Sequence, residues 1–376
     1  MRIAIVGCGF VADLYVQTLV NHPGLELAGV FDRAPERLRR FADFYGLRSY
    51  SSLADLFHDS SVQLIANLTN PGSHFAVSQD ALRAGKHVYS EKPLAMTMGE
   101  ARQLVSLAEQ RGLKLSCAPC NLLGETAQTF WKALRDGSIG TPRLAYAELD
   151  EGQLFLGYRR WRSRSGSPWP FEDEFEVGCT LEHAGYYLGW LTAFFGPARH
   201  IASSVGVHAD TQGPVKNGYA PAFATASIDF ASGLTARITC STFTTGDHSL
   251  RVFGDDGILS TPDCWDYASP VYLTYRVPRS WRDSHPHRAE LLGMRRKVPL
   301  VRPARFLHDE SRGLRMDFAR GLAELAHSLD QNREPRMSAQ WSLHVTELAL
   351  AMNAGERVPH TLSTTFAPIG PMPWAM

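Results

Sequence analysis

The residues best suited to binding a charged ligand lie within the first twelve positions. Gly7-Cys8-Gly9-Phe10-Val11-Ala12 fits the pattern G-x-G-x-x-A, and it stands between a short apolar run and a helical pattern. In such a turn Gly7 permits the tight bend, Gly9 lets the backbone approach a pyrophosphate, and Ala12 lets the helix sit close on the sheet. The N-terminus of the helix then faces the phosphate charge, so the pattern predicts a dinucleotide site.

An acid at the end of the second apolar run supports this interpretation and favours NAD over NADP. Asp32 lies 23 residues after Gly9, where its carboxylate can accept hydrogen bonds from both ribose hydroxyls. A carboxylate in this place repels the 2′-phosphate of NADP. The adjacent Arg33 weakens the preference, because a guanidinium can stack on adenine or hold a phosphate.

One pair among the six cysteines, Cys117-Ala-Pro-Cys120, has the spacing of a redox or metal site. It has no second pair beside it and it ends an apolar run, so two ordinary thiols at a strand end are favoured. No metal site is predicted. A chain of this length needs no disulfides, and a location in the reducing cytoplasm is expected.

Short apolar runs alternate with helical patterns over the first 120 residues, which predicts a parallel, doubly wound α/β sheet. A capping box at Thr97 to Glu100 opens the helix that runs to Gln110. Residues 1–120 are therefore expected to form a Rossmann domain. Its strands are expected at 2–7, 25–32, 62–69, 86–90 and 113–117.

The pattern changes after residue 120 to longer alternating runs, which predict a large mixed, mainly antiparallel sheet. Residues 121–376 are expected to form an α/β domain for substrate binding and oligomerisation. Strands are expected at 142–149, 201–207, 223–230, 234–241 and 249–253, and helices at 125–135, 178–195, 316–329 and 338–353. The last two helices are expected to pack back onto the first domain, residues 276–315 to be irregular, and residues 368–376 to be an extended tail.

The bulk composition excludes several classes of function. The chain has 376 residues, 44% hydrophobic and 20% charged, as expected for a soluble protein of two domains. Its 38 basic and 38 acidic residues balance, which argues against a general nucleic-acid-binding protein. No apolar run is long enough to predict a membrane span. Asp13 interrupts the apolar start, so a signal peptide is not expected either.

Two motifs near residue 90 carry a resemblance to a known family. Lys86-His-Val-Tyr-Ser-Glu91-Lys92-Pro93 follows Thr69-Asn70-Pro71-Gly-Ser-His74 by one βαβ unit. With the helix ending Arg135-Asp-Gly-Ser-Ile-Gly140, the Gly178 to Gly196 helix and the late helix near Phe318, they resemble the Gfo/Idh/MocA oxidoreductases. That family is named for glucose–fructose oxidoreductase, inositol dehydrogenase and rhizopine catabolism, and the similarity covers almost the whole chain. Its members act on many sugars and polyols, so the motifs specify no substrate.

The resemblance implies roles for the residues of these motifs. Lys92 would reach the reacting oxygen of the substrate and stabilise negative charge that develops there. Glu91 would orient nearby groups at the cofactor site, and Pro93 would fix the backbone after the lysine. The remaining implied cofactor neighbours are Thr69, Asn70 and His74.

The second family signature is a helix that carries Asp and His four residues apart after a glycine. Counted from Gly178, this chain has Glu182 in place of the Asp and Tyr186 in place of the His. Some members that resemble the glucose–fructose enzyme use a tyrosine there as the proton donor. Residues four apart share a helical face, so Glu182 and Tyr186 are both expected to meet Lys92, whose ammonium should lower the tyrosine pKa from about 10. His183, about 100° round the helix, is the competing acid–base candidate.

The substrate side is less well specified by the sequence. Trp161 can stack on a sugar face, Arg162 can bond hydroxyls or a carboxylate, and Asn121 follows the last Rossmann strand. Asp173 and Glu176 are weaker candidates of the same kind. The basic stretch 276–315, with 11 Arg or Lys against four acids, is interpreted as solvated or subunit-contacting, with a phosphate contact as the alternative.

The expected reaction is reversible hydride transfer between nicotinamide and a secondary alcohol or ketone of a sugar-like small molecule. Tyr186 and Lys92 would handle the hydroxyl proton, and Glu182 would orient them. One alternative is oxidation and elimination on a glycoside with NAD retained through the cycle. Another is a sensor of sugars or dinucleotides that has lost the chemistry, which the missing histidine favours.

A homodimer or homotetramer is also expected, as in family members that this chain resembles. The mixed sheet of the second domain should have one face that its own helices leave uncovered, and an uncovered apolar face is normally buried by a partner. The tail 368–376 is expected near an interface or the mouth of the active site.

Overall fold

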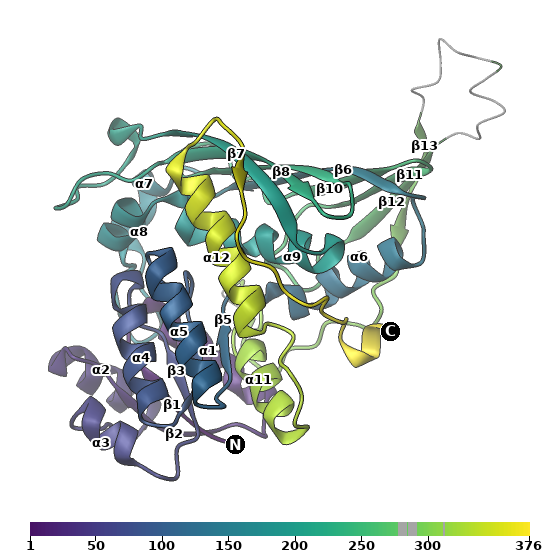
Figure 1. Ribbon diagram of the computed structural model, residues 1–376. Helices are drawn as coiled ribbons and strands as arrows, with labels where there is room; N and C mark the ends of the chain where they lie inside the picture. The colour runs from purple at the N-terminus through teal and green to yellow at the C-terminus, as the bar shows by residue number, and fades with distance from the viewer. Residues whose placement is uncertain (277–283, 285–291, 311–312) are drawn as a thin grey trace.

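The protein is built on two sheets, with most of the helices packed around and between them (Figure 1). The computed structural model describes residues 1–276, 284, 292–310 and 313–376. Among the helices described there, none has the length and apolar content that a bilayer crossing requires.

The N-terminal sheet is parallel, with five strands in the order β2-β1-β3-β4-β5. The strands are β1 (Arg2–Val6), β2 (Glu26–Phe31), β3 (Leu64–Asn67), β4 (His87–Ser90) and β5 (Leu115–Cys117). The helices around it are α1 (Phe10–Thr18), α2 (Pro35–Tyr45), α3 (Leu53–His58), α4 (His74–Arg83) and α5 (Met98–Gln110). Half of the expected capping box forms: the Thr97 hydroxyl accepts from the Glu100 N–H at 3.2 Å, while the Glu100 carboxylate accepts from the Thr97 hydroxyl at 3.1 Å in place of the Thr97 N–H. The predicted Rossmann sheet is confirmed.

The second sheet is mixed, with nine strands in the order β13-β12-β11-β10-β6-β9-β8-β7-β14. Of its paired strands only β6 and β9 run parallel. The strands are β6 (Pro142–Asp150), β7 (Ala198–Gly206), β8 (Phe223–Phe230), β9 (Thr235–Ser241), β10 (Leu250–Gly254), β11 (Gly257–Thr261), β12 (Val271–Arg276), β13 (Leu292–Val298) and β14 (His360–Thr361). A hairpin turn joins β8 and β9, where Gly233 has a φ of +86°.

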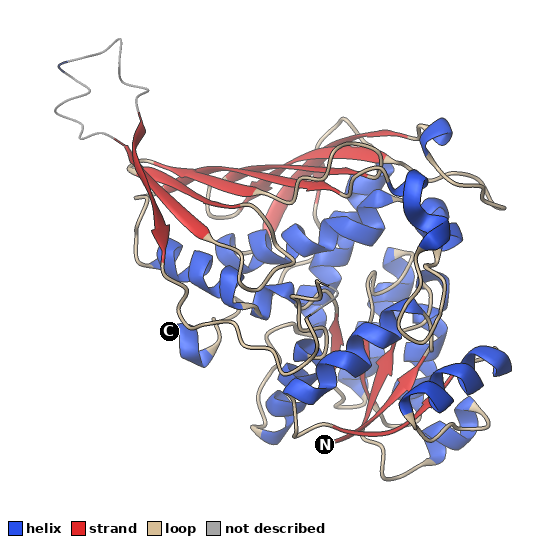
Figure 2. Cartoon of the chain, turned by 180° about the vertical axis from the view of Figure 1, so that it is seen from behind, coloured by secondary structure: helices blue, strands red, loops and turns tan. Residues whose placement is uncertain are grey.

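Helices cover one face of this sheet and leave the other without a described helix (Figures 1 and 2). The covering helices are α6 (Glu125–Arg135), α9 (Gly185–Phe195) and α12 (Ala339–Ala354). Along β6, Ala145 and Ala147 are buried beneath them, while Leu144 and Tyr146 face outward and stay half-buried. Period-two alternation therefore places an apolar layer on the covered face, while the open face carries Leu144 and Tyr146 together with the arginines Arg237 and Arg251, which pair with Tyr146 across the strands.

The two late helices join the sheets, as expected. α11 (Arg320–Asp330) lies so close to β4 that a Cβ on Gly321 would come within 2.2 Å of the Tyr89 hydroxyl. α12 packs against α5 and β5 on one side and against β7 and α9 on the other.

Three sequence expectations about local structure were wrong. Residues 276–315 are not all irregular, because β13 lies among them and pairs with β12. The expected helix 178–195 is irregular at its start, because Gly178 has a φ of +94° and lies outside it, and its first turn, Thr180–Ala184, is π-helical before α9 (Gly185–Phe195) continues it. The tail ends in a short 3-10 turn, Pro373–Ala375, where the Ala375 carbonyl accepts from Arg135 of α6.

Candidate active site

The glycine turn between β1 and α1 has the geometry that a bound pyrophosphate needs. Gly7 has a φ of +101°, and a Cβ there would come within 2.5 Å of the Leu68 carbonyl oxygen, so only glycine fits. A Cβ on Gly9 would meet nothing within 4 Å, and no side chain caps the helix at this residue. Phe10, Val11 and the fully buried Ala12 form the first turn of α1. The open space and the uncapped N–H groups fit a dinucleotide.

Asp32 lies at the end of β2, where the sequence places it, and it is already engaged with the turn. Its Oδ2 accepts from the Cys8 N–H at 2.9 Å and its Oδ1 accepts from the Ala34 N–H at 2.8 Å. Arg37 of α2 forms an ion pair with Oδ2 at 3.0 Å, a partner that the sequence analysis missed. A carboxylate has about four acceptor positions, so ribose hydroxyls can still bind. Arg33 beside it is exposed.

A loop of the second domain crosses over the glycine turn. Ser165 donates from its N–H to Asp13 Oδ1 and from its hydroxyl to Asp13 Oδ2, both at 2.8 Å, and both residues are buried. The Ser167 hydroxyl donates to the Cys8 carbonyl at 3.3 Å and accepts from Arg40 of α2 at 2.9 Å. We call residues 163–168 the strap, since it ties the second domain to both helices that flank the dinucleotide turn.

Glu91 holds the backbone beside Lys92. It accepts from the Tyr15 hydroxyl of α1 at 2.7 Å and from the Lys92 N–H at 3.0 Å. Tyr15 in turn packs edge-on against Phe318, with ring centroids 5.8 Å apart. Glu91 therefore links α1 to the backbone of the residue that carries the lysine side chain. The sequence did not predict the hydrogen bond from Tyr15 to Glu91, because no motif links these two positions.

His74 is fully buried and faces protein groups on both sides of its ring. Its Nδ1 lies 2.7 Å from the Pro93 carbonyl and its Nε2 lies 2.8 Å from the Thr69 carbonyl. Through these two contacts His74 ties the loop after β3 to the loop after β4. Asn70, in contrast, reaches across to the second domain and donates to Asp173 of α8 (Phe171–Val177).

Lys92 and Glu182 meet as an ion pair. Lys92 follows β4, and Glu182 lies in the π-helical turn before α9. Burial would lower the pKa of Lys92, but the negative charge of Glu182, helped by Glu174 and Glu91, outweighs it, and the pKa lies above its ordinary value. The lysine is therefore an ammonium ion at neutral pH. π-helical turns occur frequently at functional sites, and this one directs Glu182 toward the lysine.

His183 points away from this pair into a buried row of charges. Its Nε2 contacts Glu174 of α8, and its Nδ1 lies 3.0 Å from Glu151 Oε1. His248 continues the row at 3.5 Å from Glu151 Oε2, and Asp263 ends it. Burial would lower the pKa of His183, yet the two carboxylates raise it to about 10, so the ring is a cation. The same ring holds the pKa of Glu151 at about 2 against the effect of burial.

Tyr186 lies beside the ion pair, as expected, but its pKa is not lowered. Burial raises the pKa above its ordinary value and outweighs the opposing effect of the Lys92 ammonium. The tyrosine is therefore neutral at pH 7 and able to donate a proton. Its ring packs against Trp265, with centroids 5.2 Å apart, and the Trp265 Nε1 is buried with no hydrogen-bond partner in the described chain. Trp265 follows β11 and was missed, because it stands outside every motif.

The three expected substrate residues have different surroundings. Asn121 is buried and donates to the Tyr186 carbonyl at 3.2 Å and the Cys264 carbonyl at 3.3 Å, so it anchors α9. Trp161 packs on Trp169, and Arg162 donates to the Arg159 and Trp161 carbonyls. The ring contact of Trp161 and the hydrogen bonds of Arg162 thus stay within their own loop. Of the three residues, only Asn121 contacts Tyr186.

Asp173 has a raised pKa at the edge of this site. Burial is the largest cause, and the charges of Glu182, Glu176 and Glu172 add to it, so the pKa rises to about 6. All six cysteines are free and buried, including Cys117 and Cys120. Within the described residues, no group of His, Cys, Asp and Glu has an arrangement that could hold a metal ion.

A dinucleotide turn beside a lysine–carboxylate pair defines an NAD-dependent oxidoreductase, and comparison with known proteins gives the family. Residues 1–118 match the oxidoreductase family with an NAD-binding Rossmann fold, and residues 127–260 match the GFO/IDH/MocA C-terminal domain. The chain belongs to the Gfo/Idh/MocA family, which confirms the resemblance.

Individual relatives are distant. An uncharacterized oxidoreductase from Synechocystis is 25% identical over 283 residues, which is 71% of this chain and 73% of that protein. The UDP-N-acetylglucosamine 3-dehydrogenase of Acidithiobacillus ferrooxidans is 30% identical over 148 residues, which is 39% of this chain and 45% of the relative. The structure of the Bordetella pertussis WlbA dehydrogenase with NADH and UDP-GlcNAcA has a TM-score of 0.72 at 18% identity, covering 96% and 97% of the two chains. At that identity the likeness shows the fold.

Proposed function

We propose that this protein transfers a hydride between NAD and a secondary alcohol or ketone of a sugar derivative, with Lys92 and Tyr186 at the reacting oxygen. The observation that carries the proposal is the buried Lys92–Glu182 ion pair beside Tyr186, at the carboxyl end of β4. In doubly wound sheets ligands bind beyond the carboxyl ends of the strands, which is where the glycine turn also lies.

The two side chains have complementary tasks. Bound NAD supplies the position that accepts or returns the hydride. The Lys92 ammonium hydrogen-bonds the substrate oxygen and stabilises negative charge on it, and Glu182 holds the lysine in place. Tyr186, which is neutral at pH 7, donates its proton to that oxygen in the direction of ketone reduction, and it takes the proton back in the reverse direction.

The surroundings of His183 support Tyr186 as the acid–base group. A histidine with carboxylates at both nitrogens and a pKa of about 10 is a poor proton acceptor at neutral pH. Its charge balances Glu174 and Glu151, which are buried with it. Removing one member of such a group leaves uncompensated buried charge, so its task is structural.

A sugar derivative is the substrate class that the site favours. Trp265 places an aromatic ring beside Tyr186, and aromatic rings pack against the C–H faces of sugars. Relatives named as acting on UDP-N-acetylglucosamine or D-apiose point to the same class. For the cofactor we propose NAD in preference to NADP because of Asp32, although Arg37 and the exposed Arg33 bring positive charge to the same strand end.

The strap favours a second candidate, in which NAD stays bound through an oxidation and elimination cycle on a glycoside. Its four hydrogen bonds to Asp13, Cys8 and Arg40 close over the turn that would hold the pyrophosphate. Release of the dinucleotide would require these bonds to open, which favours slow exchange of the cofactor.

We further propose a closed homo-oligomer built on the face of the nine-stranded sheet that carries no described helix. Tyr146 and Phe253 pack against each other there at 5.1 Å, and Leu144, Ile258 and Tyr272 are half-buried on the same face. A cluster of half-buried apolar side chains of this kind is often covered by a partner. We place the domain boundary near residue 120, between the two family matches. We also propose a location in the reducing cytoplasm, because all six cysteines are free thiols.

The deciding experiment is a screen of NAD reduction against a panel of sugars, inositols and sugar nucleotides. The unmodified protein should reduce NAD with at least one member, and Lys92→Ala should abolish that activity while still binding NADH. Conversion of a glycoside with no net NADH would select the second candidate. Binding of sugars without turnover in either direction would contradict both enzymatic candidates. It would favour a protein that senses sugars or dinucleotides and has lost the chemistry.

A further inference from the structure

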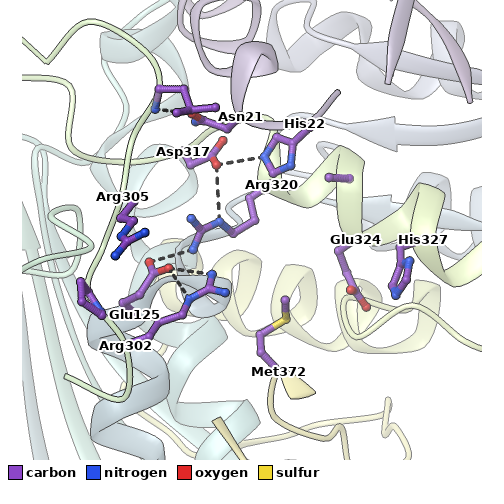
Figure 3. A pocket seen from close by; sticks show the side chains of 13 residues that line it. Asn21, His22, Glu125, Arg302, Arg305, Asp317, Arg320, Glu324, His327 and Met372 are labelled. Atoms are coloured by element: carbon purple, nitrogen blue, oxygen red, sulfur yellow. Dashed lines mark hydrogen bonds and ion pairs between the residues drawn. The ribbon is translucent and has the colours of Figure 1, made fainter. Parts of the chain in front are cut away.

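A second cavity, of about 700 Å³, lies away from the Lys92–Glu182 pair (Figure 3). It is formed where the end of α1, the start of α6, one side of α11, the segment 302–307 and the tail come together. Its lining residues are Asn21, His22, Glu125, Arg302, Pro303, Arg305, Leu307, Asp317, Arg320, Ala323, Glu324, His327 and Met372. None of them belongs to the glycine turn or to the site around Tyr186.

The walls of this cavity are strongly charged and held in place. Glu125, which is 1% exposed, accepts from Arg302 at 2.8 and 3.0 Å and from Arg320 at 2.8 Å. Arg302 also lies 3.7 Å from the ring centroid of Trp374, and Arg320 lies 4.6 Å from that of Tyr267. Side chains fixed by the fold in this way lose little further entropy when a ligand binds.

Positive charge exceeds negative charge when the two arginines directly behind these walls are counted with the residues that line them. Arg302, Arg305 and Arg320 line the cavity with Glu125, Asp317 and Glu324. Glu324, however, is bonded from outside by two more guanidiniums, those of Arg333 and Arg336. Five guanidinium groups therefore face three carboxylates, which leaves an excess of two positive charges, as a phosphate dianion needs.

Two groups in the walls lack protein partners within the described chain. Arg305 is exposed, forms no ion pair, and lies beside Glu125 and Arg302 across the cavity from Glu324 and His327 (Figure 3). Asp317 is 1% exposed, and although its Oδ2 pairs with His22 at 2.9 Å and Arg320 at 3.5 Å, its Oδ1 is buried without a hydrogen bond. The guanidinium of Arg305 can bind an anionic group of a ligand. The buried Oδ1 of Asp317 can accept a hydrogen bond from a hydroxyl of the same ligand.

We propose that this cavity binds a phosphorylated polyol or sugar, with its phosphate at Arg305 and a hydroxyl directed to Asp317. Pockets for small molecules commonly enclose about 300–1,000 Å³, so the volume suits a ligand of this size. The proposal does not rest on the reaction assigned to Lys92 and Tyr186.

The test is calorimetric titration of the full chain, saturated with NADH so that the glycine turn cannot take up phosphate. The probes are glycerol 3-phosphate, inorganic phosphate, sulfate and glycerol. Glycerol 3-phosphate should bind more tightly than either inorganic ion, and glycerol should not bind. Arg305→Gln should weaken binding about tenfold or more, because a charge-assisted contact is removed. Arg199→Gln, at an exposed arginine of β7, should leave binding unchanged.

Further measurements separate this site from its alternatives. Lys92→Ala should retain full binding, and loss of binding there would assign the signal to the active site and overturn the proposal. Equal affinity in Arg305→Gln, or weak binding of all anions at high concentration only, would mean an adventitious ion only. If Arg305→Gln lowers the mass found by light scattering and leaves phosphate binding unchanged, the cavity is an interface between copies of the chain, and the proposal fails.

Discussion

Lys92 and Glu182 form an ion pair that joins the two sheets of the protein, although they stand 90 positions apart in the chain. The side chain of Lys92 is 20% exposed and that of Glu182 is 8% exposed, so the pair is mostly desolvated. A charge pair in such surroundings keeps its geometry only while both sides of the domain contact are in place. The proposed reacting group therefore depends on how the Rossmann domain meets the turn before α9.

Removal of the Tyr186 hydroxyl should abolish most of the activity. Tyr186→Phe is expected to lower turnover by about two to four orders of magnitude, the range for loss of general acid–base catalysis, with little change in substrate affinity. Lys92→Ala should be at least as damaging, because it removes a charge as well as a hydrogen bond. Steady-state kinetics with the substrate found in the screen gives both numbers.

His183→Asn is the matched comparison for that experiment. It should act mainly on stability, because it leaves Glu174 and Glu151 buried without their cation. Its turnover per folded molecule should fall much less than that of Tyr186→Phe. Near-normal turnover in Tyr186→Phe together with none in folded His183→Asn would falsify the assignment.

Asp32 should set the preference between dinucleotides. NAD(H) is expected to bind more tightly than NADP(H), because the carboxylate repels a 2′-phosphate. Asp32→Ala should narrow the gap, since it frees Arg37 to hold the phosphate, and adding Arg37→Gln should remove that gain. If calorimetry shows that the unmodified protein binds NADP(H) more tightly than NAD(H), the proposed role of Asp32 is wrong.

The strap should control how fast the dinucleotide leaves. Ser165→Ala removes the hydroxyl bond to Asp13 Oδ2 and keeps the backbone bond to Oδ1. A hydrogen bond contributes about 1 kcal/mol, so NADH should dissociate roughly fivefold faster, as measured by stopped-flow fluorescence. Ser106→Ala, at an exposed position of α5, is the control. Equal dissociation rates in both variants would show that the strap does not gate release.

Asp173 should make the protein less stable at neutral pH than its amide variant. Its pKa of about 6 in the folded protein lies above the value of 3.8 expected for an ordinary Asp. The group therefore contributes its full stability below about pH 4 and loses it as the pH rises through 6. Asp173→Asn should gain about 1–2 kcal/mol at pH 7.5 after allowance for partial exposure, and nothing near pH 4.

Urea unfolding of the protein without cofactor at the two pH values measures this difference. Glu176→Gln is the control, because hydrogen bonds from Asn217 and Lys216 lower the pKa of Glu176. It should not stabilise at either pH. A gain in Asp173→Asn that is the same at both pH values would contradict the titration.

The open face of the nine-stranded sheet should hold the oligomer together. Light scattering at micromolar concentration is expected to give a dimer or tetramer. Phe253→Glu should dissociate it, because it places a charge among the apolar side chains of Leu144, Tyr146 and Ile258. Phe44→Glu, at a phenylalanine of α2 that is 50% exposed, should leave the mass unchanged. A strict monomer of the unmodified protein would count against this interface.

Features that depend on neighbours along the chain could be predicted from the sequence alone. The glycine turn at Gly7 and Gly9, Asp32 at the end of β2 and the N-cap hydrogen bond of Thr97 all formed as expected. Each depends on local backbone geometry and on the spacing of a few adjacent residues. The family motifs also pointed correctly to Lys92 and Glu182 as neighbours.

The tertiary structure decided which groups surround the reacting pair. Helical periodicity could not distinguish Tyr186 from His183, because the π-helical turn at Thr180–Ala184 departs from the regular spacing. The burial that raises the Tyr186 pKa, the two carboxylates on His183 and the Trp265 ring all come from remote segments. Desolvation and charge are set by whatever the fold packs within a few ångströms, and that packing is not encoded in the order of residues around any single motif.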